Sequence, residues 1–292
     1  MVLADKWTDY QIIATGDGYK LERWGNVTLL RPDPQVIWKT NFDMFNHKGL
    51  NAKYIRSETG GGRWEHLKPM PDEWVVSYKE LKFKIKPMGF KHTGLFPEQA
   101  ANWEKMTALI KGANRPISVL NLFAYTGGAT VACLKAGASV CHVDAAKGMV
   151  ERAGENCRLS GVGEGKVRFI IDDCLKFVQR EIRRGRKYDA IIMDPPSFGR
   201  GPGGETWKIE NELYNLVKIC TQVLSDNPLF FLINSYTTGF QPQVLKNVLT
   251  LLMPKGNYKI EAYEVGLPTD EGIALPCGCS GLWSEKKESE DK

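Results

Sequence analysis

The sequence has no apolar stretch near the roughly 18 residues that a membrane-spanning helix requires. Residues 1–10 carry charges where a signal peptide would be apolar. We therefore expect a cytoplasmic protein. The seven cysteines are an odd number scattered along the chain, and they lack the paired ligand spacing of a zinc site. We interpret them as reduced thiols and expect no metal.

A strong excess of one charge is also absent. The net charge of +5 favours a polyanionic partner such as RNA only mildly, because specific nucleic-acid binders are often more basic. Hydrophobic residues at 42% and charged residues at 25% are ordinary for a globular chain, which argues against disorder or a fibrous repeat. The length of 292 residues allows one large domain and one small one.

From residue 116 onward, short apolar runs alternate with amphipathic stretches, as in a parallel sheet with crossover helices. Strands are predicted at residues 118–123, 139–143, 167–171, 188–193 and 229–234. Helices are predicted at 128–135, 147–159, 175–184, 210–224 and 242–253. Gly137, Gly161 and Gly185 follow three of these helices, where a left-handed C-cap is favoured. This pattern predicts a doubly wound α/β fold of the Rossmann-like type.

The two ends of the chain differ from this pattern. Residues 258–265 and 274–283 look extended and are joined by 266–272, which predicts a C-terminal antiparallel hairpin. Six of the eight tryptophans precede residue 104, and alternating runs there predict a small β-rich N-terminal module, for which we hypothesise a role in substrate binding. We therefore expect this module at 1–90, the main domain at 91–284 and a disordered tail at 285–292.

The turn after the first predicted strand carries a candidate ligand-binding loop at residues 121–130. Gly127 and Gly128 allow a positive φ and remove side chains that would block a ligand lying across the turn. The loop lacks the Gly-x-Gly-x-x-Gly spacing with which a dinucleotide-binding sheet holds pyrophosphate, which disfavours a nicotinamide-dependent oxidoreductase. An ordinary strand–helix loop is the plainer interpretation.

Aspartates end the next two predicted strands. Asp144 lies where an acidic residue would accept the ribose hydroxyls of a nucleoside cofactor, although it could instead cap the following helix. Asp173, after the third strand, could accept a hydrogen bond from an adenine amino group, and helix capping explains it equally well.

The fourth predicted strand runs into the most specific motif of the chain, Asp194, Pro195, Pro196, Ser197 and Phe198. The prolines fix φ and force the residues before them out of the helical region. A rigid loop would then present the Asp194 carboxylate and the Pro195 carbonyl to a planar amino group, while a neighbouring aromatic ring stacks on the base. Here Ser197 occupies the position next to the prolines, and the aromatic residue comes one later.

Two other groups of residues could carry function. Cys277 and Cys279 begin the last predicted strand, where a thiolate could add to C6 of a cytosine, although a structural role is simpler. Lys82, Lys84 and Lys86 alternate along one predicted strand and could follow a phosphate backbone. Five basic residues near the end of the third helix could do the same, but we interpret them as a solvated face.

Together, residues 122–128, 173–177 and 194–198 resemble the bacterial ribosomal-RNA large-subunit methyltransferase family, as do residues 93–99. The similarity covers residues 80–285 and implies a class I fold with S-adenosyl-L-methionine as cofactor. It implies cofactor contacts at Phe96, Gln99, Asn121, Phe123, Ala124, Tyr125, Thr126, Gly127, Asp144, Ala145, Asp173, Cys174 and Asp194. Residues 234–238 lack the cysteine that cytosine-C5 members carry after the fifth strand, and no RNA-binding PUA domain is visible.

The sequence therefore predicts an S-adenosylmethionine-dependent methyltransferase acting on a base nitrogen of RNA, in particular ribosomal RNA. Asp194 and Pro195 would orient the target, and Tyr125 and Phe198 would shape the cleft. Two alternatives remain open. One is a cytosine-C5 RNA methyltransferase that uses Cys277 or Cys279, and the other is a non-catalytic RNA-binding factor with a methyltransferase fold.

Overall fold

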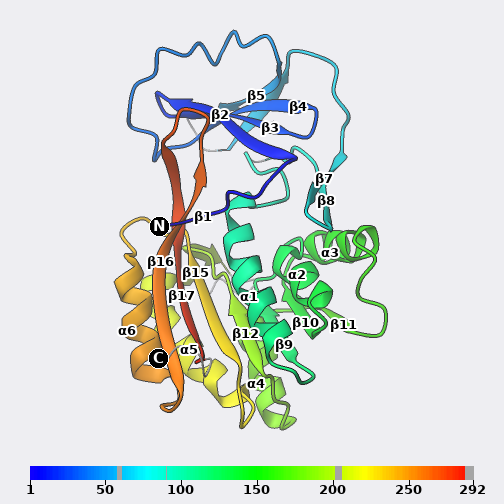
Figure 1. Cartoon of the computed structure of the whole chain (residues 1–292), viewed down its shortest axis with the longest axis vertical. Coiled ribbons are helices and arrows are strands. Elements are labelled where there is room, and N and C mark those ends of the chain that lie inside the picture. Colours follow the sequence, from blue (N-terminus) through cyan, green and yellow to red (C-terminus); the bar gives the residue numbers. More distant parts are fainter. Residues whose placement is uncertain (58–60, 90, 201–205, 287–292) are drawn as a thin grey trace. The chain divides into compact units, whose positions relative to one another are not determined.

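In the computed structural model the chain forms two compact units, which are treated separately below (Figure 1). Residues 1–57, 61–89, 91–200 and 206–286 are described. The main unit comprises Asn102–Val265 and the chain from Gly278 onward. The N-terminal unit comprises Val2–Ala101 and Gly266–Cys277. The sequence predicts that the N-terminal module ends at residue 90. The compact N-terminal unit of the structure extends eleven residues further, to Ala101, and also includes the segment Gly266–Cys277.

The large sheet has the strand order β16-β17-β15-β12-β9-β10-β11, and β1 (Val2–Leu3) extends it beside β16. Its other strands are β9 (Ser118–Leu122), β10 (Ser139–Asp144), β11 (Val167–Ile171), β12 (Ala190–Met193), β15 (Phe230–Ser235), β16 (Tyr258–Pro268) and β17 (Ala274–Glu285). Five neighbouring strands of this sheet are parallel, namely β11, β10, β9, β12 and β15 in sheet order. Strand β17 is antiparallel to β15. This order, with its reversal at β9 and β12, is the predicted doubly wound sheet.

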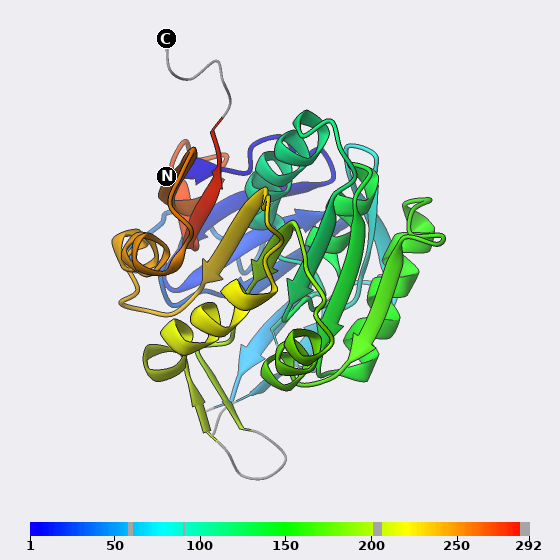
Figure 2. The same cartoon turned by 90° about the horizontal axis from the view of Figure 1, so that it is seen from below.

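Helices flank the parallel strands (Figure 2). They are α1 (Ala100–Gly112), α2 (Gly128–Lys135), α3 (Lys147–Leu159), α4 (Cys174–Arg183), α5 (Ile209–Cys220) and α6 (Pro242–Leu252). Strands β12 and β15 are buried along their whole length, and β9 is buried from its second residue onward, because both faces of a parallel sheet are covered. Gly137, Gly161 and Gly185 have φ of 104°, 64° and 65°, which confirms the predicted left-handed C-caps.

The sequence missed α1 and a short hairpin. Strands β13 (Phe198–Arg200) and β14 (Thr206–Lys208) pair antiparallel directly after the proline motif. Their three-residue length is too short for a period of two to be recognised in the sequence. The predicted disordered tail lies mostly outside the described residues, at 287–292, but Glu285 belongs to β17 and Ser284 is 1% exposed.

The N-terminal unit is β-rich, as predicted. Strands β2 (Tyr10–Gly16), β3 (Tyr19–Trp24), β4 (Val27–Pro32), β5 (Leu50–Arg56) and β6 (Gly62–His66) form a five-stranded sheet in chain order. Strands β7 (Trp74–Tyr78) and β8 (Leu81–Ile85) form a separate hairpin, and the short 3-10 helix η1 spans Pro97–Gln99. Glu22 and Arg31 form a buried ion pair across β3 and β4, and the hydroxyl of Tyr10 donates to Glu22.

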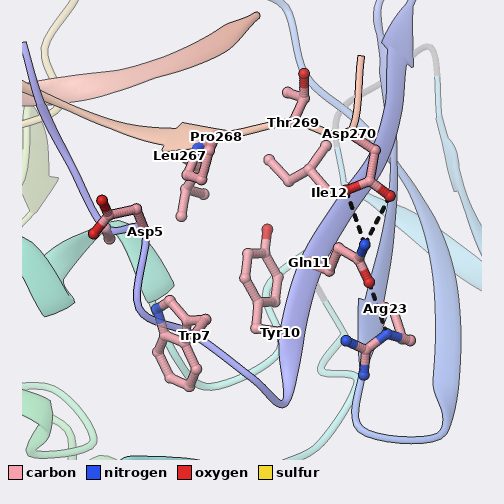
Figure 3. A pocket seen from close by; sticks show the side chains of 11 residues that line it. Asp5, Trp7, Tyr10, Gln11, Ile12, Arg23, Leu267, Pro268, Thr269 and Asp270 are labelled. Atoms are coloured by element: carbon pink, nitrogen blue, oxygen red, sulfur yellow. Dashed lines mark hydrogen bonds between the residues drawn. The ribbon is translucent and has the colours of Figure 1, made fainter. Parts of the chain in front are cut away.

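The turn between β16 and β17 completes the N-terminal unit. Gln11 donates to both carboxylate oxygens of Asp270, at 2.8 and 2.7 Å, and the backbone N–H of Thr15 donates to Glu271 at 2.8 Å. A pocket of about 350 Å³ lies beside this contact (Figure 3). Arg23 donates to Gln11 within it, so these polar side chains bond one another, and none of the predicted site residues lines the pocket.

Candidate active site

The loop after β9 has an unusual backbone. Phe123 and Tyr125 have φ of 53° and 50°, and Gly127 has φ of 84°, so three alternate residues adopt the left-handed conformation. This conformation costs energy for a residue with a side chain, and such strain concentrates at functional sites. Phe123 and Tyr125 are half-buried, whereas Ala124, Thr126 and Gly127 are buried. The loop therefore presents its two aromatic residues at the carboxyl edge of the sheet.

Asp144, the last residue of β10, supports this loop. Its Oδ2 accepts the backbone N–H of Tyr125 at 2.8 Å, and its Oδ1 accepts that of Ala146 at 2.9 Å. Helix α3 has Ala146 as N-cap without a side-chain bond, so Asp144 does not cap it. Each carboxylate oxygen has further acceptor capacity, and the side chain is half-buried. Asp144 is thus not the N-cap residue itself, but its bond to the N–H of Ala146 still supports the start of α3. The ribose interpretation stays a prediction.

Asp173 and Cys174 begin α4. Asp173 is the N-cap, and its Oδ1 accepts the backbone N–H of Lys176 at 2.8 Å, which confirms the capping interpretation. Asp173 is exposed, so its carboxylate could also meet a ligand. Cys174 is buried, and its sulfur accepts the backbone N–H of Phe123 at 3.3 Å. Burial raises the pKa of this thiol to about 12, so Cys174 supports the strained loop as a neutral group.

The glycine pair has a packing role that the sequence did not show. A Cβ at Gly127 would meet Ala153 of α3 at 2.9 Å, and one at Gly128 would meet the indole of Trp103 at 2.7 Å. These glycines therefore allow close approach of helices, in addition to the positive φ at Gly127. Nothing in this contact requires a bound ligand.

Asn121 is turned away from the sheet edge. It is 3% exposed, and its amide donates to Thr130 at 2.9 Å, while the Thr130 hydroxyl bonds the ring of His142 at 2.9 Å. Burial lowers the pKa of His142 to about 4, so the imidazole is neutral at physiological pH. This series of hydrogen bonds connects β9, α2 and β10 beneath the loop.

The proline motif follows β12. Asp194 is half-buried and Pro195 is buried, and the Ser197 hydroxyl bonds that of Thr237, after β15, at 2.6 Å. The indole N–H of Trp207 donates to the carbonyl oxygen of Pro196 at 2.6 Å. The Trp207 ring also lies 6.0 Å from that of Phe123, centroid to centroid. Trp207 therefore connects the motif to the strained loop, a role the sequence did not indicate.

Phe198, which the sequence predicts to shape the cleft, lies at the start of the β13–β14 hairpin. It is 53% exposed and pairs with Lys208 across the hairpin, while Trp207 pairs with Gly199. Because adjacent residues of a strand point to opposite faces, Phe198 and Trp207 are on opposite sides of the hairpin. Trp207, rather than Phe198, is the aromatic residue that packs on the loop.

The two candidate nucleophiles are thiols in buried surroundings. Cys279, on β17, pairs with Ser235 of β15 and is 4% exposed. Its thiol donates to the carbonyl oxygen of Phe240 at 3.4 Å. Burial raises its pKa to about 11. Cys277, in the N-terminal unit, is half-buried, and burial together with the charge of Glu98 raises its pKa well above the ordinary value. The raised pKa values disfavour the thiolate that nucleophilic attack requires.

The remaining predicted residues are distributed over both units. Ala145 is exposed after β10. Phe96 and Gln99 belong to the N-terminal unit, where Phe96 contacts the ring of His92 and Gln99 ends η1. Among the described residues, no cluster of three or more His, Cys, Asp or Glu side chains could hold a metal ion. No helix in the described ranges is long and apolar enough to cross a membrane.

The basic patches differ in their pairing. Lys82 and Lys86 are exposed, but Lys84 forms an ion pair with Glu73 at 2.8 Å. In the cluster near α4, Arg180 pairs with Asp172, and Arg184 pairs with the buried Glu181 at 3.0 Å. The arginine cluster thus contributes to the structure of α4, in line with the interpretation as a solvated face.

The sequence pattern of S-adenosylmethionine-dependent methyltransferases matches residues 43–239, about two-thirds of the chain. The chain belongs to this family. The predicted enzyme class and cofactor are thereby confirmed. A crystal structure of the S-adenosylmethionine-dependent methyltransferase from Agrobacterium tumefaciens is 32% identical and superimposes with a TM-score of 0.90 over 98% of this chain and 94% of that one. The class I fold predicted from the sequence is confirmed as well.

Curated relatives match more locally. The ribosomal RNA large subunit methyltransferase K/L of Shewanella frigidimarina is 30% identical over 180 residues, which are 61% of this chain and 24% of that protein. The methyltransferase K of Neisseria meningitidis is 25% identical over 226 residues, 74% of this chain and 63% of that protein. The chain therefore spans about a quarter of the first of these relatives and less than two-thirds of the second.

The residues at the sheet edge fit the family's cofactor. A half-buried carboxylate at the end of β10, with acceptor capacity remaining on both oxygens, matches a ribose diol. Half-buried aromatic side chains at Phe123 and Tyr125 match a nucleoside and a sulfonium group, since a cation is attracted to an aromatic face. Asn121, Thr126 and Gly127, three of the predicted cofactor contacts, are buried. They would affect the cofactor indirectly, by supporting the loop after β9.

Proposed function

We propose that this protein transfers a methyl group from S-adenosylmethionine to a base nitrogen of RNA, with ribosomal RNA as the substrate and the cytoplasm as its place of action. The observation that carries the proposal is the position of Asp194. A buried proline follows it, and the Pro196 carbonyl and the Ser197 hydroxyl are fixed by Trp207 and Thr237. The relatives named as ribosomal RNA methyltransferases support RNA as the substrate.

Within this proposal, Asp144 holds the ribose of the cofactor, and the loop from Phe123 to Gly127 lines it. S-adenosylmethionine supplies an electrophilic methyl group when bound. Asp194 and the Pro195 carbonyl accept hydrogen bonds from the target amino group and direct its nitrogen lone pair toward that methyl. The carbon–sulfur bond would break as the carbon–nitrogen bond forms, and the positive charge would pass to the nitrogen, which then releases a proton to solvent. The protein's contribution is therefore orientation more than charge stabilisation.

The state of the cysteines favours nitrogen over cytosine C5. Methylation at C5 requires a thiolate that first adds to C6 of the ring. The pKa values of Cys277 and Cys279 are both raised, and Cys279 is buried and bonded to a carbonyl. A general base would have to deprotonate one of these thiols, and Cys279 would also have to become accessible.

Mass spectrometry of ribosomal RNA from a strain that lacks the gene tests the proposal. The expected result is loss of one methylated nucleotide, which returns when the purified enzyme and S-adenosylmethionine are added to that RNA. An unchanged set of modified nucleotides, with no methyl transfer to deproteinised RNA in vitro, would contradict it. Binding of RNA without any turnover would instead favour the non-catalytic RNA-binding factor.

A further inference from the structure

The β13–β14 hairpin has two chemically different faces. Strand pairing places Gly199 opposite Trp207 on one face and Phe198 opposite Lys208 on the other. The hairpin leaves the sheet directly at the proline motif and returns directly into α5. Its position relative to Asp194 is therefore fixed by the backbone at both ends.

The Trp207 face anchors the hairpin to the main unit. The indole donates to the Pro196 carbonyl, packs against Phe123 and belongs to the partly buried rim of the main core. A second bond comes from the backbone N–H of Ile209, which donates to the Ser197 carbonyl at 3.1 Å. The face that carries Trp207 is thus partly buried against the main unit.

The Phe198 face remains open to solvent. Phe198 is 53% exposed, and the exposed Lys208 lies directly opposite it. Lys208 forms no ion pair with any residue in the described part of the chain. The acidic residues that follow, Glu210 and Glu212, occupy the first turn of α5, where the helix N-terminus favours negative charge. An exposed aromatic ring beside an exposed cation is the combination that binds single-stranded nucleic acid.

We propose that this face of the hairpin is a docking site for single-stranded RNA next to the target nucleotide. Phe198 stacks on an unpaired base, and Lys208 contacts the neighbouring phosphate. The inference rests on the proposed RNA substrate and adds the contact that positions it. It gives Phe198, which was expected to shape the cleft, a direct contact with the substrate, whereas Trp207 anchors the hairpin.

The test measures binding of a short fluorescein-labelled single-stranded RNA of mixed sequence to the full-length protein. Phe198→Ala should weaken binding by about 5- to 100-fold, as expected for the loss of one base–aromatic stack, and Phe198→Trp should retain it. Lys208→Ala should reduce the log–log salt slope by about 0.7 for one phosphate contact with a single strand. Tyr214→Ala and Lys218→Ala, exposed positions on α5, are matched controls that should bind like wild type.

The outcomes separate this inference from the proposed function. Methyl transfer to deproteinised RNA by the wild type, with unchanged RNA affinity for Phe198→Ala, overturns the docking site and leaves the function intact. Failure of the wild type to bind or methylate RNA removes both. If Phe198→Ala loses activity on ribosomal particles but not on deproteinised RNA, the hairpin contacts protein and the RNA assignment is wrong.

Discussion

The carboxylate of Asp144 accepts the backbone N–H of Tyr125 at 2.8 Å, so the end of β10 holds the left-handed loop after β9. The two parts of the expected cofactor site are therefore coupled. A change in the carboxylate removes a proposed ribose contact and also releases the strained loop.

Asp144→Ala should weaken binding of S-adenosylmethionine by about 10- to 100-fold, because a hydrogen bond to a charged acceptor contributes about 1.5–3 kcal/mol. Isothermal titration calorimetry measures the change. Asp226→Ala, at an exposed position before the amino end of β15, is the matched control. An affinity equal to that of the wild type would remove Asp144 from the cofactor site.

Asp194→Ala should reduce turnover by about 100-fold or more while the cofactor affinity stays within a few-fold. This split is expected when a positioned polar group at the reacting centre is lost. Single-turnover methylation of RNA and calorimetry on the same preparation give the two quantities. An equal loss in both would place the carboxylate against the cofactor instead of the target.

Replacing Lys82, Lys84 and Lys86 together with alanine should weaken RNA binding and flatten its salt dependence. Each lost phosphate contact lowers the slope by roughly 0.7–0.9. Because Lys84 is half-buried and pairs with Glu73 whereas the side chains of Lys82 and Lys86 are exposed, we expect Lys82 and Lys86 to account for most of the change. The Lys84→Ala single variant should bind RNA nearly as well as wild type. An unaltered salt slope in the triple variant would show that Lys82, Lys84 and Lys86 form only a solvated face.

Cys277→Ala and Cys279→Ala should each retain most of the methyl-transfer activity, because both thiols are protonated at neutral pH. RNA containing 5-fluorocytidine should form no covalent adduct with the wild type. The pKa of about 11 for Cys279 also predicts slow alkylation at pH 7 that accelerates as the pH rises toward that value. An adduct that disappears when either cysteine is replaced would establish the cytosine-C5 alternative.

The parallel sheet was predictable because its strands are short, mostly apolar runs that alternate with amphipathic helical stretches, and an acidic residue ends or follows β10, β11 and β12. The ends of β10 and β11 at Asp144 and Ile171 follow from those boundaries. Helix α1 was missed because it begins at the domain boundary and buries Asn102, a polar residue that bonds Asn234 and Ser280. A buried amide network has no signature in the periodicity of one helix.

The candidate site was predictable in its residue types but not in their partners. Asp144 and Asp173 looked alike in the sequence, since both follow a strand and precede a helix. Only the structure shows that Asp173 caps α4 whereas Asp144 bonds the loop after β9. Trp207 was overlooked because the hairpin that carries it is too short to be recognised in the sequence and because its ring partner, Phe123, is distant along the chain.

The hydrogen bonds from Gln11 and Thr15 to the β16–β17 turn have a consequence for how the protein can be divided. The N-terminal unit is made of two segments separated by the whole parallel sheet. A fragment ending at residue 101 would leave Gln11 and Thr15 without Asp270 and Glu271. Limited proteolysis at a single site therefore cannot release this unit with both of its segments.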